Sequence, residues 1–401
     1  MENPNLKVIS QKFGGTSVAT AERRLMVVGH VQREINSGYK VALVISAMGR
    51  RGDPYATDTV LDLLRNQGGE VVPRNYSFIF VTGEMISVAV MVHTLQLGNI
   101  PAVALTGGMA GIITEDFHMS AKVTSMDNRT LVQYLKEGTV PVVCGGQGST
   151  QTAGDFSILG RGGSDTTGVL VGIMTQAERA DIYTDVEYML AADPRVIPDA
   201  PKREVISFEA AYEMARFGAK VVHPGSVLLG MQHNLPIRVR STFSQNPGTL
   251  ITDHVDSCPL VGLPVVGSVQ VATMNGKILD ESERNALEQH VGLLSLIDAS
   301  SGELMLCAPS GDTLGLVDME LEKVGITGVS WKPGYSLLSL VGLEEAIVEM
   351  DKKSRSVMND YSIPYLRHEM TKMRVTYVIP EEKLKTALAE VYSKLRGYLS
   401  I

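Results

Sequence analysis

The stretch VISQKFGGTS, residues 8–17, is a short apolar run that leads directly into a pair of glycines. The run Val8–Phe13 predicts a buried strand, and the helical spacing of apolar residues over 25–35 predicts a helix after the glycines. Adjacent glycines let backbone N–H groups approach an anion, and Lys12 adds a full positive charge. The stretch fits either a phosphate-binding turn or an ordinary strand-to-helix turn with a solvated lysine.

Short apolar runs continue to alternate with amphipathic stretches over the first 250 residues. We expect further strands at Val41–Ser46, Ser77–Val81, Pro101–Leu105, Val140–Cys144, Ala180–Thr184 and Ile237–Arg240. Near-continuous apolar strands that alternate with helices predict an α/β fold, in which a mainly parallel sheet is covered by helices on both faces. Such sheets bind ligands at the carboxyl ends of their strands, which is where the glycine-rich segments of this chain fall.

The composition excludes several classes of protein. The chain has 401 residues, of which 44% are hydrophobic and 20% charged, so it can form real cores and is not a disordered chain. A formal net charge of −8 argues against binding to nucleic acid or to an anionic membrane surface. Hydrophobic runs such as Val41–Ile45 are far shorter than a membrane span. The polar segment Met1–Val8 lacks the apolar stretch of a signal peptide. We expect a soluble, cytoplasmic protein.

The chain offers no obvious metal or disulfide framework. Its three cysteines are scattered and never form a C-x-x-C spacing, and its eight histidines include no H-E-x-x-H. We therefore predict no metal site made by the protein itself.

A second glycine-rich stretch, GRGGSDTT at residues 160–167, is the strongest candidate site. Arg161 stands among glycines with little to pack against, so a carboxylate or phosphate partner is the expected purpose of its guanidinium group. Ser164 and Asp165 follow at the start of an expected helix, where either side chain could also serve as an N-cap.

Other polar residues follow expected strands and would be unremarkable singly. Ser46 and Thr57 follow the strand at Val41–Ser46, and Gly83-Glu84 follows the expected strand Ser77–Val81. Thr184-Asp185 closes another strand, and Arg195 comes after an Asp-Pro pair that alone predicts a type I turn.

The pattern changes near residue 250. Prolines and polar residues predict a linker at 253–263, and shorter strands and helices follow it. We expect one α+β unit with a strand at Val265–Thr273 and helices at Glu281–Leu294 and Thr313–Val324. A second unit has a strand at Ser336–Val341, a helix at Leu343–Met358, and two more strands before a last helix. Asp280 and Glu283 have the spacing of a capping box.

The motifs occur together in the order typical of aspartokinases, members of the amino acid kinase family. They are KFGGTS at 12–17, SAMG at 46–49, GE at 83–84, GRGGSD at 160–165, TDV and ADPR within 184–195, FEAA at 208–211 and GAKV at 218–221. The chain resembles this family over about residues 7–252. The resemblance implies an amino acid kinase catalytic domain at 1–252, a linker at 253–263 and a tandem ACT-type regulatory region at 264–401.

The resemblance also implies an activity. Aspartokinases transfer the γ-phosphoryl group of ATP, with Mg²⁺ carried by the nucleotide, to the β-carboxylate of L-aspartate. The product is 4-phospho-L-aspartate, which opens the aspartate-derived pathway to lysine and threonine. The same likeness implies a homodimer or higher homo-oligomer joined through the C-terminal region.

Site residues follow from the matched motifs. The resemblance makes Lys12 and Asp165 the catalytic pair. It assigns the binding of L-aspartate to Ser46, Thr57, Glu84, Arg161 and Ser164. It assigns the binding of ATP to Lys12, Gly14, Gly15, Thr184, Asp185, Arg195 and Lys220.

The chain also departs from the family pattern. Leu190 stands in place of a nucleotide-loop tyrosine, within an altered segment at 187–191. The effector-pocket signatures are missing at Thr273–Lys277 and Asp298–Ser301, and Gly342–Glu345 runs straight into a helix. Two alternatives therefore stay open: a kinase for another amino-acid carboxylate, and an amino-acid sensor derived from a weakened kinase.

Overall fold

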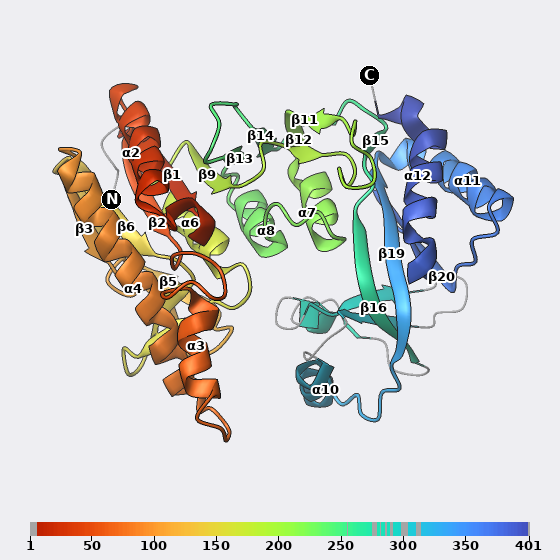
Figure 1. Cartoon of the computed structure of the whole chain (residues 1–401), viewed down its shortest axis with the longest axis horizontal. Coiled ribbons are helices and arrows are strands. Elements are labelled where there is room, and N and C mark those ends of the chain that lie inside the picture. Colours follow the sequence, from red (N-terminus) through yellow and green to blue (C-terminus); the bar gives the residue numbers. More distant parts are fainter. Residues whose placement is uncertain are drawn as a thin grey trace. The chain divides into compact units, whose positions relative to one another are not determined.

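The computed structural model describes residues 6–254, 256–274, 279–280, 282–284, 287–288, 292–297, 304–309 and 314–399. These residues form two compact units, which are drawn in Figure 1 and are described separately. Unit 1 comprises Met1–Tyr188 and Val221–Asp253, and unit 2 comprises Met189–Lys220 and His254–Ile401. The segment Met189–Lys220 therefore groups with the C-terminal residues, although the sequence places it within a continuous N-terminal domain.

Unit 1 is built on a mainly parallel sheet, as expected. Its strands lie in the order β14 (Thr249–Thr252), β13 (Ile237–Ser241), β9 (Arg179–Thr184), β1 (Val8–Phe13), β2 (Lys40–Ile45), β6 (Val140–Cys144) and β3 (Ala102–Leu105). All neighbouring pairs from β13 to β3 are parallel, and β14 pairs antiparallel with β13. A smaller sheet has the order β5 (Val123–Met126), β4 (Ile112–Thr114), β7 (Gln147–Thr150) and β8 (Phe156–Ile158).

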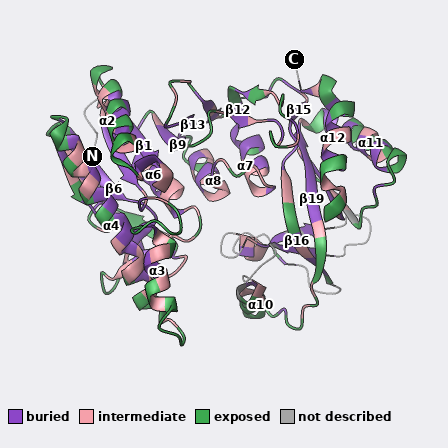
Figure 2. Cartoon of the chain, in the orientation of Figure 1, coloured by how far each residue is buried: buried purple, intermediate pink, exposed green. Residues whose placement is uncertain are grey.

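Helices cover both faces of the main sheet. Phe13, Leu43 and Ile45 pack into one core with α2 (Ala21–Asn36) and α4 (Pro73–Leu97). Ser10 points to the opposite face, where its hydroxyl donates a hydrogen bond to the Gly168 carbonyl of α6 (Gly163–Met174) at 2.7 Å. The remaining helices of unit 1 are α1 (Gly15–Val18), α3 (Thr57–Arg65), α5 (Arg129–Lys136) and α8 (Pro224–Gln232). Figure 2 shows the strands of this sheet as largely buried.

The expected strand at Ser77–Val81 is wrong, because these residues lie inside the 25-residue helix α4. Pro73 occupies its first turn, where the missing N–H group costs nothing. The buried residues include Ser77, Val81, Glu84, Val88, Met91 and Leu95, which recur at helical spacing. The aromatic and β-branched residues at 78–81 favour a strand locally, but the burial of one helical face decides the structure.

By length and composition alone, α4 could cross a lipid bilayer, since its most apolar window has a mean hydropathy of 1.8. The expectation that no run approaches a membrane span overlooked it. In unit 1 the helix packs against β3, β6 and β8. It also carries the buried carboxyl group of Glu84. These contacts are those of a helix that covers a sheet, and such core helices commonly pass the same test.

Unit 2 is built on one large antiparallel sheet instead of separate strand–helix–strand units, and it also holds a short antiparallel pair of β10 (Met189–Leu190) with β11 (Lys202–Arg203). The large sheet has the order β17 (Leu294–Ile297), β18 (Leu304–Pro309), β16 (Val265–Met274), β19 (Lys332–Gly342), β21 (Arg374–Pro380) and β20 (Arg367–Met370). The pairing of β16 with β19 joins the two halves that the sequence predicts. β15 (Leu260–Gly262) also pairs with β19, so the expected linker at 253–263 contains a strand.

The helices of unit 2 agree with the α+β prediction. α11 (Glu344–Asp360) and α12 (Leu384–Leu395) pack on the sheet through a core that includes Met350, Tyr377 and Leu388. α10 (Leu314–Lys323) lies near the helical residues 282–284 and 287–288, and the capping box is confirmed by bonds of 2.8 and 3.0 Å between Asp280 and Glu283. The rest of the helix expected at Glu281–Leu294 lies outside the described residues, apart from 292–294. The other elements are β10 (Met189–Leu190), β11 (Lys202–Arg203), β12 (Val205–Ser207) and α7 (Phe208–Arg216).

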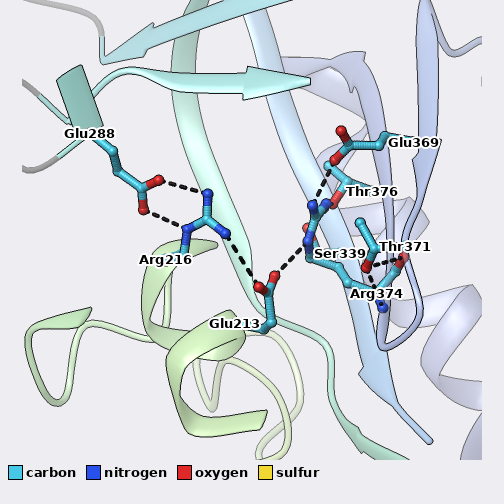
Figure 3. Close-up of polar contacts among 8 residues, drawn as sticks. All are labelled: Glu213, Arg216, Glu288, Ser339, Glu369, Thr371, Arg374 and Thr376. Atoms are coloured by element: carbon cyan, nitrogen blue, oxygen red, sulfur yellow. Dashed lines mark hydrogen bonds and ion pairs between the residues drawn. The ribbon is translucent and has the colours of Figure 1, made fainter. Parts of the chain in front are cut away.

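A network of buried ion pairs connects α7 to the sheet of unit 2 (Figure 3). Glu213 of α7 accepts from Arg374 Nε of β21 at 2.7 Å and from Arg216 Nη1 at 3.2 Å. Arg216 forms a two-bond pair with Glu288, at 2.7 Å for each bond. Arg374 also contacts Glu369 of β20 at 2.6 Å, and its side chain is only 4% exposed.

Candidate active site

Lys12 and Asp165 form a nearly buried ion pair in unit 1. Lys12 lies near the carboxyl end of β1, and Asp165 lies in the first turn of α6. The Lys12 Nζ atom is 2.6 Å from Asp165 Oδ1, and the two side chains are 11% and 14% exposed. The two residues predicted to be catalytic therefore meet at the strand end where the sequence placed a ligand.

The turn before α6 has a backbone that only glycine adopts readily. Gly162, the N-cap residue, has φ of 64°, and a Cβ atom there would lie 2.0 Å from Cγ of His223. No side-chain hydrogen bond caps this helix, so neither Ser164 nor Asp165 is explained as an N-cap. Arg161 on this turn is exposed. Arg161 thus lies on the turn before α6, and Ser164 and Asp165 lie in the first turn of that helix.

His223 is part of this arrangement, and sequence reasoning missed it. Its ring packs against Gly162, and its backbone N–H donates to Asp165 Oδ2 at 3.2 Å. Burial lowers the pKa of the imidazole, which favours its neutral form. The only signal was a lone histidine before Pro224-Gly225, a pattern that also marks an ordinary helix start.

Glu84 lies in the middle of α4 and not at a strand end as expected. Its side chain is nevertheless beside Thr57 at the start of α3, whose hydroxyl donates to Glu84 Oε1 at 3.2 Å. Glu84 is 3% exposed, and burial raises the pKa of its carboxyl group to about 8. Two of the predicted substrate-binding residues are thus in contact.

The KFGGTS turn packs tightly against the segment that follows β2. A Cβ atom at Gly15 would lie 2.4 Å from the Ala47 carbonyl oxygen, and the Gly49 N–H donates to the Gly15 carbonyl at 2.9 Å. The Ser46 N–H donates to the Phe13 carbonyl at 3.2 Å, which ties the two strand ends together. Ser46, Gly14 and Gly15 therefore share one edge of the sheet.

Thr184 is the last residue of β9, and Asp185 follows it at the same edge. The Thr184 hydroxyl donates to Asp185 at 3.1 Å, and Arg50 pairs with Asp185 at 3.1 Å on the surface. A pocket of about 350 Å³ opens here between Thr16, Gly49 and Asp185, among others. The carboxyl ends of β1, β2 and β9 thus border a recess of unit 1.

Arg195 and Lys220, also predicted to bind ATP, belong to unit 2. Arg195 lies on the Asp-Pro turn, where its exposed guanidinium group pairs with Asp193 at 2.6 Å. Lys220 is exposed after α7. Leu190, which replaces the expected tyrosine, lies in β10 of the same unit. These residues therefore belong to a different unit from the Lys12–Asp165 pair.

The unit 1 cluster has the chemistry of an anion-handling site. An ammonium group and several hydroxyl and amide donors lie around one sheet edge, and the exposed Arg161 lies on the turn before α6. Such groups stabilise negative charge that develops on a phosphoryl or carboxylate group. No group of three or more His, Cys, Asp or Glu side chains suited to hold a metal ion occurs in the described ranges of either unit.

Sequence comparisons place the chain among known proteins. The sequence profile of the amino acid kinase family matches residues 7–241. Aspartokinase 1 of Bacillus subtilis (strain 168) is 44% identical over 252 residues, which cover 63% of this chain. That alignment spans 62% of the relative's length, less than two thirds of it. An aspartokinase of Bacillus sp. (strain MGA3) is 30% identical over 350 residues, with 84% of each chain covered.

Solved structures show the same fold. Escherichia coli aspartokinase III in complex with aspartate and ADP has a TM-score of 0.78 and 22% identity, covering 97% of this chain and 100% of its own. The same enzyme in complex with lysine and aspartate has a TM-score of 0.67 and 23% identity, covering 97% and 99%.

Proposed function

The chain belongs to the amino acid kinase family, and to the aspartokinases within it, and from this premise we propose that it phosphorylates L-aspartate with ATP. The acceptor is the β-carboxylate, and the product is 4-phospho-L-aspartate, the first intermediate of the aspartate-derived amino-acid pathway. The observation that carries the proposal is the Lys12–Asp165 pair at 2.6 Å. Ser164 precedes Asp165 in the first turn of α6, and Arg161 lies on the turn before that helix.

Phosphoryl transfer to a carboxylate requires mainly that the protein position the two substrates and supply positive charge. Lys12 and the amides of Gly14 and Gly15 neutralise the phosphoryl oxygens as transfer proceeds. Asp165 holds the Lys12 ammonium group in place. It has no proton to remove, because a substrate carboxylate is already ionised near neutral pH.

The remaining residues bind the two substrates. Arg161 and Ser164 bind a carboxylate of aspartate, with Ser46 and Thr57 beside them, and Glu84 receives the α-ammonium group. The binding of ATP is assigned to Thr184, Asp185, Arg195 and Lys220. Magnesium enters with the nucleotide and supplies further positive charge on its phosphates. The oxygen-rich edge at Thr184-Asp185 suits such a hard cation.

The domain assignment follows the same proposal. Residues 1–252 form the catalytic domain, residues 253–263 form the connection, and residues 264–401 form a tandem ACT-type regulatory region. Two or more copies of the chain associate through this regulatory region into a homodimer or larger homo-oligomer. We place the protein in the cytoplasm. Light scattering at micromolar concentration tests the oligomer, and a stable monomer would contradict it.

Two experiments test the activity. ADP release is measured with L-aspartate, L-glutamate and N-acetyl-L-glutamate as acceptors, and hydroxylamine is added to trap an acyl phosphate as its hydroxamate. Of the three acceptors, we expect only L-aspartate to give ADP and the hydroxamate. Preference for another acceptor would favour a different carboxylate kinase, and aspartate binding without ADP would favour a sensor.

Arg161→Ala is expected to weaken the use of aspartate at least about tenfold, because a charge-assisted hydrogen bond contributes roughly 1.5–3 kcal/mol. The loss should appear in kcat/KM for aspartate and leave the KM for ATP nearly unchanged. A matched control is Arg129→Ala, since Arg129 is an exposed arginine of unit 1 that pairs only locally with Asp127. Aspartate kinetics equal to those of the parent would remove Arg161 from the site.

Regulation by lysine or threonine is expected to be weak or absent. The sequence lacks the effector-pocket signatures, although residues 275–277 and 298–301 lie outside the described residues. After β19, Leu343 is the N-cap residue of α11 and its side chain makes no capping hydrogen bond. Glu344 and Glu345 lie in the first turn of this helix. Two carboxylates there disfavour the carboxylate of an amino-acid effector. Titrating lysine, threonine and both into the kinase assay tests this, and strong inhibition below 1 mM would overturn it.

A further inference from the structure

We propose that Glu84 is protonated in the free protein and gives up its proton when the ammonium group of the amino-acid substrate binds. The carboxylic acid loses its O–H proton to the solvent, and the resulting carboxylate pairs with the incoming ammonium group. Binding is thereby coupled to the release of a proton. This inference rests on the proposed function and extends it to the pH dependence of substrate binding.

The geometry around Glu84 leaves one of its oxygens without a partner. The side chain is 3% exposed on the inner face of α4, and Thr57 donates one hydrogen bond to Oε1 at 3.2 Å. The other oxygen, Oε2, is buried and has no hydrogen-bond partner in the described part of the chain. A buried oxygen without a partner costs free energy, so it indicates a group that awaits a ligand.

The surroundings of Glu84 supply no cation. α4 packs against α2, α3, β2, β3, β6 and β8. The polar groups that act on the Glu84 carboxyl group are the Thr57 hydroxyl of α3 and the backbone of Ala47, after β2, and of Glu84 itself. Glu84 in turn acts on the thiol of Cys144 in β6. Cys144 is 1% exposed, and burial raises the pKa of its thiol to about 12, with Glu84 adding to the effect. No described lysine, arginine or histidine forms an ion pair with Glu84.

An isolated carboxylate is unfavourable in such a place. Burial raises the pKa of the Glu84 carboxyl group to about 8, so the neutral acid predominates at pH 7. An ammonium group brings one positive charge and three N–H donors. Its arrival favours the ionised form, because an opposite charge nearby lowers the pKa of a carboxyl group. The proton must therefore leave as the substrate enters.

The coupling predicts a definite number of protons. With a pKa of about 8, roughly 0.9 of the free molecules carry the proton at pH 7, so aspartate binding should release about 0.9 proton. The apparent association constant should rise about tenfold from pH 6 to pH 7, since only the ionised form pairs with the ammonium group. N-acetyl-L-aspartate, which has no ammonium group, should release none.

Isothermal titration calorimetry tests the coupling directly. Aspartate is titrated into the full chain at pH 7 in phosphate and in Tris, whose ionisation enthalpies differ, and the dependence of the binding enthalpy on the buffer gives the proton number. Glu84→Gln keeps the shape but cannot titrate, so it should bind aspartate weakly and release no proton. Thr57→Val keeps the carboxyl group while removing its hydrogen bond, so it should still release about one proton.

The unfolding free energy gives a readout that needs no ligand. The folded free protein binds more protons at Glu84 than the unfolded chain between about pH 5 and pH 8, so the parent should lose stability relative to Glu84→Gln as pH rises through this window. Aspartate binding with no buffer dependence would overturn the coupling and leave the proposed function intact. No aspartate binding, together with no aspartate-dependent ADP, would overturn both.

Discussion

Replacing Lys12 with methionine should lower kcat for aspartate-dependent ADP formation by about 100- to 1000-fold. Losing one preorganised group that stabilises transition-state charge typically costs this much. Lys12 is well placed for that task, because its side chain is only 11% exposed and its ammonium group lies 2.6 Å from Asp165. Methionine keeps most of the length of the side chain, so the variant chiefly removes the charge. Single-turnover kinetics at saturating aspartate and ATP separate this loss from a loss of binding.

Controls make the Lys12 result specific. Lys7→Met removes an exposed lysine of unit 1 that lies just before β1, and we expect it to leave kcat unchanged. Asp165→Asn keeps the ammonium group but removes its partner, so it should lower kcat by a smaller factor. Circular dichroism confirms that each variant is folded. If the Lys12→Met variant keeps nearly the parental kcat, Lys12 takes no part in the chemistry and has only a structural role.

The sequence predicts best where a pattern depends on one element alone. Val8–Phe13 and Val140–Cys144 are strands in the structure because both faces of the sheet are covered, which requires continuous apolar runs. Lys12 lies near the carboxyl end of β1, where the topology predicts a ligand, whereas Asp165 reaches it from the first turn of α6, which follows β8 of the smaller sheet. The rule that ligands bind at this edge needs only topology.

Prediction failed where tertiary contacts override local preference. Residues 78–81 favour a strand, yet they complete a long helix whose inner face carries Glu84. The same error misplaced Glu84 at a strand end, and its burial could not be read from the sequence. The grouping of Met189–Lys220 with the C-terminal residues likewise depends on contacts across the chain. The ion-pair network of unit 2 joins residues as far apart as Glu213 and Arg374, and no local pattern signals it.

Arg374→Met is expected to be the most destabilising substitution in unit 2, at about 3–5 kcal/mol of unfolding free energy. The guanidinium group is almost fully buried between two carboxylates, at 2.7 Å from Glu213 and 2.6 Å from Glu369. It also stacks on the Phe217 ring, with its Cζ atom 3.8 Å from the ring centroid. Removing it takes this cation away from both acids, so Glu213 is left with Arg216 at 3.2 Å.

The size of the effect should follow burial and not the mere presence of an ion pair. Arg396 pairs with Asp199 at 3.0 Å in the same unit, but both side chains are more than 60% exposed. Arg396→Met should therefore cost less than about 1 kcal/mol, because water already solvates both charges. Urea denaturation of the two variants and the parent compares them. Adding Glu213→Gln to Arg374→Met removes one of the two acids that lose Arg374 as a partner, so it should recover part of the lost stability. If Arg374→Met and Arg396→Met unfold at the same urea concentration, the network of α7 and β21 is not what holds this part of unit 2 together.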